Sequence, residues 1–186
     1  MTLLRPLTLL AIALLPDTAF ACTAEGAFGI AFGSKPPGRD IRKLYDSGPA
    51  TWYEVRPPRP DARFDRYEIR VDKKTNEIYE IVGITSILPR PRTMEEAERI
   101  TPEQKAEAAA KADALALRYL EALPPEIRSA MKQSQFGGAD WGGRIAENLG
   151  LDIAADVHWD VRVACRDAKR EQTFGRRLQK ELLGKN

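Results

Sequence analysis

Two strand-like segments between Phe64 and Leu88 constrain the fold of this chain more than any other part of its 186 residues. In the first, Phe64–Val71, apolar residues alternate with charged ones (RYEIRV), which predicts a strand with one buried and one solvated face. The second, Glu77–Leu88, is apolar on both faces, which predicts a central strand that is covered on both sides. The polar sequence DKKTNE between them predicts a hairpin turn, so we expect an antiparallel sheet.

Helix signals follow the predicted hairpin. Thr101 and Gln104 form a capping box around Pro102, which predicts a helix from Pro102 to about Leu123. Its apolar stripe at helical spacing consists of Ala108, Ala112, Leu115, Tyr119 and Leu123. Shorter helices are expected to begin at Thr93, which has Glu96 as its capping partner, and to span Pro125–Lys132. A last helix would carry Phe174, Leu178 and Leu182, and a strand at 172–178 is the alternative there.

The remaining segments complete an α+β fold. Thr51–Arg56, Val157–Cys165 and residues 26–33 are interpreted as strands, the last with Phe28, Ile30 and Phe32 on its buried face. Residues 41–45 are interpreted as a helical turn, and the Gly-rich residues 136–150 as a loop with a helical turn at 144–149. Strands cluster first, helices follow and one strand comes late. This order fits a single small domain in which helices pack mainly on one face of an antiparallel sheet.

Residues 1–21 have the three parts of a secretory signal peptide. Arg5 supplies positive charge, residues 7–15 are apolar, and Ala19-Phe20-Ala21 is a small-x-small cleavage signal that predicts cleavage after Ala21. The apolar run is far shorter than the roughly 20 residues that a bilayer-spanning helix needs. We therefore expect a periplasmic or secreted protein with a single domain over residues 22–186 and no transmembrane segment; the alternatives for residues 1–21 are an uncleaved N-terminal anchor or a buried strand.

The chain has two cysteines, Cys22 and Cys165. In an oxidising compartment an even pair predicts a disulfide bond, here between the new N-terminus and the buried face of a late strand. The alternative is a lipid anchor on Cys22, but Ala19 and Phe20 fit the residues that precede a lipidated cysteine poorly. Neither cysteine has a local histidine that would indicate a catalytic thiol.

His158 is the only histidine, so any histidine chemistry must use it. Asp156, His158 and Asp160 alternate on a predicted strand and would share one face, where they could form part of a metal site that needs a further ligand. The other interpretation is a solvated strand face that continues to Arg162. We favour the solvated face and assign no metal, cofactor or catalytic residue from the sequence.

A second candidate site is the Gly-rich segment around Trp141. Asp140 and Glu147 are carboxylates of the kind that glycoside hydrolases use in pairs, and Trp141 could stack on a sugar ring. The alternatives are that Trp141 closes the edge of the core or contacts a partner protein.

The charge balance argues against a nucleic-acid partner. Lys+Arg number 29 against 27 Asp+Glu, a net charge of +2, whereas nucleic-acid binding needs a concentrated basic face. Several arginines could still form a basic rim for an acidic protein or an anionic polymer, or they could be ordinary solvated surface. They are Arg56, Arg59, Arg63, Arg66, Arg70, Arg90, Arg92, Arg176 and Arg177.

The sequence contains no motif that is diagnostic of a known family. An export signal, a predicted disulfide and the lack of a convincing catalytic constellation favour a non-enzymatic binding or accessory protein of the bacterial envelope, of the general type that includes inhibitors and immunity proteins. Its expected partner is another envelope or secreted protein. The alternative is a small hydrolase of envelope polymers that uses carboxylates near residues 136–150.

Overall fold

The computed structural model describes residues 22–89, 91, 93–135, 139–156 and 160–183. The predicted signal peptide, His158 and the two arginines Arg90 and Arg92 lie outside these residues. Within them the chain forms a three-stranded sheet, an eight-stranded sheet and four helices. The strands are β1 (Cys22–Thr23), β2 (Gly26–Ala27), β3 (Ile30–Ala31), β4 (Ile41–Ser47), β5 (Ala50–Val55), β6 (Arg66–Asp72), β7 (Glu77–Ser86), β8 (Lys132–Gln133), β9 (Asp140–Ala146), β10 (Leu149–Asp156) and β11 (Asp160–Asp167). The helices are α1 (Met94–Glu98), α2 (Pro102–Glu121), α3 (Pro125–Ala130) and α4 (Ala168–Leu183).

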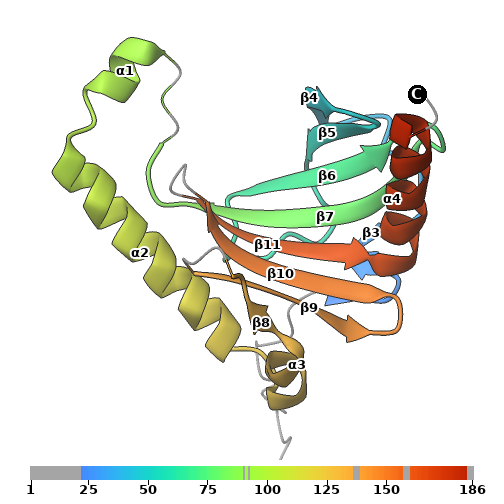
Figure 1. Ribbon diagram of the computed structural model, residues 1–186. Helices are drawn as coiled ribbons and strands as arrows, with labels where there is room; N and C mark the ends of the chain where they lie inside the picture. The colour runs from blue at the N-terminus through green and yellow to red at the C-terminus, as the bar shows by residue number, and fades with distance from the viewer. Residues whose placement is uncertain (1–21, 90, 92, 136–138, 157–159, 184–186) are drawn as a thin grey trace, which may run out of the picture.

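The large sheet is antiparallel throughout, in the order β4-β5-β6-β7-β11-β10-β9-β8. The predicted hairpin is confirmed as β6 and β7, with Ile69 opposite Ile81. β7 lies between β6 and β11 and is buried over most of its length, as its apolar faces predict. The α+β class and the helices at both ends of the strands are visible in Figure 1.

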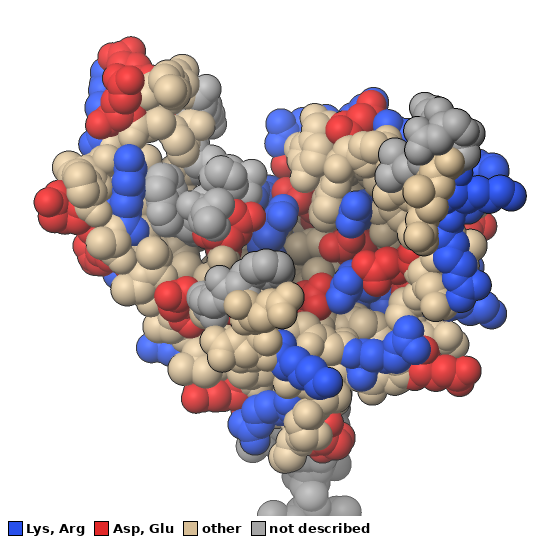
Figure 2. All heavy atoms as spheres, viewed as in Figure 1, with Lys and Arg blue, Asp and Glu red and all other residues tan. Residues whose placement is uncertain are grey.

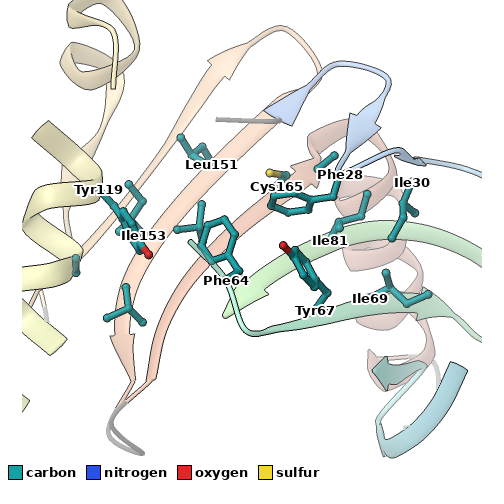
Figure 3. Packing of buried hydrophobic residues seen from close by; sticks show 14 of the residues in the cluster. Phe28, Ile30, Phe64, Tyr67, Ile69, Ile81, Tyr119, Leu151, Ile153 and Cys165 are labelled. Carbon is teal, nitrogen blue, oxygen red and sulfur yellow. The ribbon is translucent and has the colours of Figure 1, made fainter. Parts of the chain in front are cut away.

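The first face of the large sheet carries the main hydrophobic core. Ile69, Ile81, Val163 and Ile153 on four neighbouring strands are fully buried on it. α2 covers one end of this face with a stripe that includes Ala112, Ala116 and Tyr119. The capping box at Thr101 is formed as predicted. Figure 3 shows Tyr119 directed towards Ile153 and Phe64.

Polar contacts fix α2 at the end of the sheet. The Tyr119 hydroxyl donates to the Arg63 carbonyl at 3.1 Å and lies 2.9 Å from the Thr85 hydroxyl. Phe64 packs directly on Gly83 of β7. A Cβ at position 83 would come within 2.8 Å of the Phe64 ring. Glycine at position 83 therefore allows the loop before β6 to close on the core.

The N-terminal segment folds differently from the prediction. Residues 26–33 are not one strand: β2 and β3 are separated by a turn in which Phe28 and Gly29 have φ of 52° and 78°. The positive φ at Gly29 is readily adopted by glycine and reverses the chain. Phe28 still enters the core, where its ring contacts Tyr67 edge-on at 5.0 Å. The segment therefore covers the part of the first face that lies away from α2 (Figure 3).

The predicted disulfide is present. Cys22 is bonded to Cys165, with their Cα atoms 5.8 Å apart and 143 residues of chain between them. Cys165 is fully buried on the first face, as the alternation of β11 predicts. The bond occupies the Cys22 sulfur, which is the atom that a lipid anchor would need.

Two further predictions are wrong. Residues 41–45 form part of the edge strand β4 rather than a helical turn, because their backbone pairs with β5. Residues 136–150 are not a loop where the structure describes them: β9 and the start of β10 form a hairpin that turns at Glu147 and Asn148. Glycine is needed at position 142 because the Asp152 carboxylate of β10 lies where a Cβ would be.

The second face of the sheet is covered at one end by the last helix. The Asp167 carboxylate accepts backbone N–H bonds from Lys169 and Arg170, which caps the start of α4. Phe174 stacks on Tyr79 of β7 with ring centroids 5.1 Å apart. Figure 1 shows α4 across the ends of the strands opposite to α2.

Candidate binding groove on the charged face of the sheet

Strand pairing aligns charged residues in rows across the second face, which we call the charged face. One row consists of Trp52, Arg70, Glu80 and Arg166 on β5, β6, β7 and β11. The adjacent row contains Arg42, Glu54 and Glu68 on β4, β5 and β6. Like charges directly opposite each other, such as Glu54 and Glu68, destabilise a sheet unless cations compensate them. Arginines from the flanking positions supply that compensation.

The carboxylates at the centre of this face are buried and ion-paired. Glu68 is only 3% exposed and accepts a bond from Arg162 Nη2 at 2.7 Å, with Arg66 Nε 3.5 Å away. Asp160 is 0% exposed and accepts from Arg66 Nη2 at 3.0 Å. The solvated face that the sequence predicts for β6 and β11 is therefore wrong: pairing with arginine lets these carboxylates lie out of water.

The part of the charged face beside α4 is more acidic. Burial raises the pKa of Glu80, although Arg70 Nη1 lies 3.3 Å from its carboxylate and opposes the effect. Burial also raises the pKa of Asp152, to about 6, despite the bond that it accepts from Arg166 at 2.7 Å. Arg166 additionally donates to Glu171 of α4 at 2.7 Å, so this cluster attaches the helix to the sheet.

Trp52 is the aromatic centre of the charged face. The guanidinium groups of Arg70 and Arg162 lie 5.3 and 5.7 Å from its ring, within the range of a cation–π contact. The Tyr45 ring stacks on it with centroids 6.0 Å apart. Trp52 is thereby buried, whereas Tyr45 remains 49% exposed.

A groove of about 550 Å³ opens beside this aromatic pair, and we call it the Tyr45 groove. Its apolar wall is formed by Leu44 and Tyr45. Its polar lining consists of Arg42, Arg66 and Arg162 with Glu54, Glu68 and Asp156. Figure 2 shows basic and acidic side chains interleaved in the hollow of the face that Figure 1 presents to the viewer.

A second cavity of about 340 Å³ lies between α4 and the β6–β7 turn. Ion pairs cross it: Arg170 donates to Glu77 at 2.5 Å, and Arg177 pairs with Asp72. Tyr79 forms part of its wall, and burial raises the pKa of this tyrosine. These ion pairs join the helix to the hairpin, so we assign this cavity a structural role.

The structure places Asp156, the last residue of β10, directly opposite Asp160, the first residue of β11, but pairs each of them with an arginine. Asp160 is bonded to Arg66, and Asp156 lies 3.7 Å from Arg162 across the groove. His158 is outside the described residues. In the parts of the chain that the structure describes, no three histidine, cysteine, aspartate or glutamate side chains are grouped so that they could hold a metal ion.

The candidate carboxylate pair Asp140 and Glu147 is separated. Asp140 begins β9 and Glu147 follows its last residue, which places them roughly 20 Å apart at about 3.3 Å per residue. A glycosidase pair needs a separation of about 5–10 Å. Trp141 is half-buried and packs against the main core, in agreement with the interpretation that it closes the core edge.

The predicted basic rim is neutralised in part: of its seven arginines that the structure describes, four are paired with a carboxylate, and Arg56, Arg59 and Arg176 are exposed. Arg63, Arg66, Arg70 and Arg177 are each paired with a carboxylate. Arg90 and Arg92 lie outside the described residues. The paired arginines therefore supply fixed hydrogen-bond donors rather than excess positive charge.

Sequence reasoning missed Tyr45 and Trp52 as neighbours. The sequence predicts Trp52 on a strand but Tyr45 on a helical turn, and only the pairing of β4 with β5 brings the two rings together. The available signal is the pair of adjacent apolar residues Leu44 and Tyr45 in an otherwise charged segment.

Comparisons with other proteins leave the function to be argued from this geometry. The chain matches no protein-family model, and no similar protein was found among curated proteins or solved structures. Among the helices of the described residues, none is long and apolar enough to cross a lipid bilayer.

Proposed function

We propose that this chain is an exported, non-enzymatic binding or accessory protein of the bacterial envelope, and that it holds another exported protein in the Tyr45 groove. The observation that carries the proposal is a half-exposed tyrosine fixed on a buried tryptophan, beside a groove lined with ordered arginine–carboxylate pairs. Tyrosine, tryptophan and arginine are the residues that most often dominate the energy of protein interfaces.

The rigidity of the groove supports this role. Its side chains are held by ion pairs to neighbouring strands, so a partner would not need to order them on binding. Preorganised side chains lower the entropic cost of association. The disulfide supports the export part of the proposal, because such bonds persist in oxidising compartments.

The hydrolase alternative loses its specific argument. It depended on carboxylates near residues 136–150, and Asp140 and Glu147 lie at opposite ends of one strand. On the charged face, Glu68 is paired with Arg162 and Asp160 with Arg66.

Photo-crosslinking in living cells tests the proposal. Tyr45 is replaced by the photoreactive analogue p-benzoylphenylalanine, and Leu117, which is 43% exposed on α2, receives the same replacement as the matched control. We expect one discrete adduct with an exported protein from position 45 and none of that mass from position 117. The proposal is wrong if position 45 gives no adduct, or if both positions give the same adducts.

A further inference from the structure

The Tyr45 groove is electrically balanced, although the whole chain is slightly basic. Its lining contains Arg42, Arg66 and Arg162 against Glu54, Glu68 and Asp156. The net charge of the lining is zero when all six side chains are ionised, and it is −1 when Asp160, which is bonded to Arg66, is included. A groove of this kind attracts neither an acidic nor a basic partner strongly from a distance. The fields of its opposite charges largely cancel beyond about one Debye length.

The charges of the groove are also already satisfied by one another. Arg42 bonds to Glu54 at 2.5 Å, and Arg162 reaches both Glu68 at 2.7 Å and Asp156 at 3.7 Å. A carboxylate of a ligand that captured Arg162 would leave Glu68, which is 3% exposed, with a weakened partner. Breaking a buried ion pair in this way would lower affinity by roughly a hundredfold or more.

Uncharged polar groups meet no such penalty. An amide or hydroxyl can accept from an arginine N–H, or donate to a carboxylate oxygen that has a second lone pair, without displacing the ion pair. The groove therefore offers donors and acceptors side by side to a neutral ligand. Its preferred occupant is polar and carries no net charge.

Tyr45 adds an aromatic contact at the apolar wall. Its ring is 49% exposed and is held in place by the stack on Trp52, which Arg70 and Arg162 flank in turn. An aromatic side chain of a partner would gain stacking or edge-to-face energy here in addition to burial. Leu44 extends the same wall.

We infer that the partner enters the Tyr45 groove with an uncharged polar polypeptide segment that carries an aromatic side chain, and that this binding is nearly independent of salt. The inference rests on the proposed function and specifies the chemistry of its partner. It opposes the simpler expectation, drawn from the arginine content, that the partner is acidic.

Selection from a displayed library of random peptides tests the inference. The exported protein, purified from cells that express the full chain, serves as the bait. We expect the enriched peptides to contain an aromatic residue and to have a net charge near zero, and their Kd to change less than about twofold between about 50 and 500 mM salt. Tyr45→Ala should weaken them at least tenfold, whereas Tyr45→Phe and the control Leu117→Ala should retain binding.

Three outcomes would overturn the inference: enrichment of acidic or basic peptides whose affinity falls steeply with salt, equal binding by Tyr45→Ala, or no enrichment at all. A parallel titration with chitotetraose, a neutral oligosaccharide, tests for a glycan; saturable binding that Tyr45→Ala abolishes would also overturn the polypeptide occupant. The crosslinking result separates this inference from the proposed function. A partner that crosslinks from position 45 but binds in a strongly salt-dependent way leaves the proposed function standing and removes only the inference.

Discussion

The two faces of the large sheet have different physical designs. The first face buries apolar side chains such as Ile81 and Val163 beneath α2 and the N-terminal segment, whereas the second buries Glu68 and Asp160 among arginines. Both faces arise from the same strands, because alternate residues point to opposite sides. The comparison teaches that burial alone does not identify the core: one face provides stability through apolar packing, and the other provides a fixed polar surface.

The same substitution on the two faces should have unequal effects. Ile81 and Ile84 are both fully buried on β7, but Ile84 packs in a small cluster with Trp52, Val82 and Ala164 between arginines. We expect Ile81→Ala to lower the free energy of unfolding by about 4 kcal/mol and Ile84→Ala by about 2 kcal/mol, because flexible arginine stems can partly fill the second cavity. Denaturant unfolding measures both. Equal losses would mean that the charged face packs like the main core.

Glu54 and Glu68, which lie opposite each other on β5 and β6, allow the energy of an exposed ion pair to be compared with that of a buried one. Glu68→Gln removes a charge that is 4% exposed at its side chain and leaves Arg162 with a weaker acceptor, so we expect a loss of about 2 kcal/mol in the free energy of unfolding. Its neighbour Glu54 pairs with Arg42, whose side chain is 72% exposed, so Glu54→Gln should cost about 0.5 kcal/mol or less. Chemical unfolding of both variants at neutral pH provides the comparison. Similar costs would show that the burial of Glu68 has no energetic consequence.

The acidic cluster beside α4 should give the charged face a pH dependence that the apolar face lacks. Burial raises the pKa of Asp152 from 3.8 to about 6, so the folded state holds this proton more tightly than the unfolded chain. The stability that protonation provides is present below pH 4 and is lost as pH rises through about 6. Relative to Asp152→Asn, the wild type should lose about 1–2 kcal/mol of unfolding free energy between those limits. A constant difference between the two proteins across this range would contradict the account.

A similarly small effect on stability is expected at Tyr45. Because its ring is half exposed, Tyr45→Ala should change the free energy of unfolding by about 0.5 kcal/mol or less. Thermal unfolding of the variant beside wild type is the measurement. A loss as large as that of Ile84→Ala would mean that Tyr45 closes the core of the charged face, and that it is a structural residue.

Local signals in the sequence predicted the parts of the fold that depend on local contacts. The capping box at Thr101 and the hairpin of β6 and β7 are short-range patterns, and both are confirmed. β4 was missed because its residues alternate poorly and it bulges near Leu44, and the turn at Phe28 was missed because its positive φ has no side-chain signature. The conformation of β4 depends on its pairing with β5, and the turn at Phe28 depends on the pairing of β2 with β3.

The candidate site was harder to predict than the fold, since it depends on register between distant strands. Glu68 and Arg162 are 94 residues apart, and nothing in either segment alone shows that they will meet. A charged face looks the same in sequence whether it is solvated or paired. Only the order of β6, β7 and β11 in the sheet distinguishes the two cases.

The most direct test of the central claim is the affinity of the crosslinked partner for wild-type protein and for Tyr45→Ala, measured by titration calorimetry with both proteins fully folded. The account predicts that the variant binds at least tenfold more weakly while its free energy of unfolding is almost unchanged, because Tyr45 contributes to the interface and little to the fold. Equal affinities would show that the Tyr45 groove is not the binding surface, and that the charged face serves the structure alone.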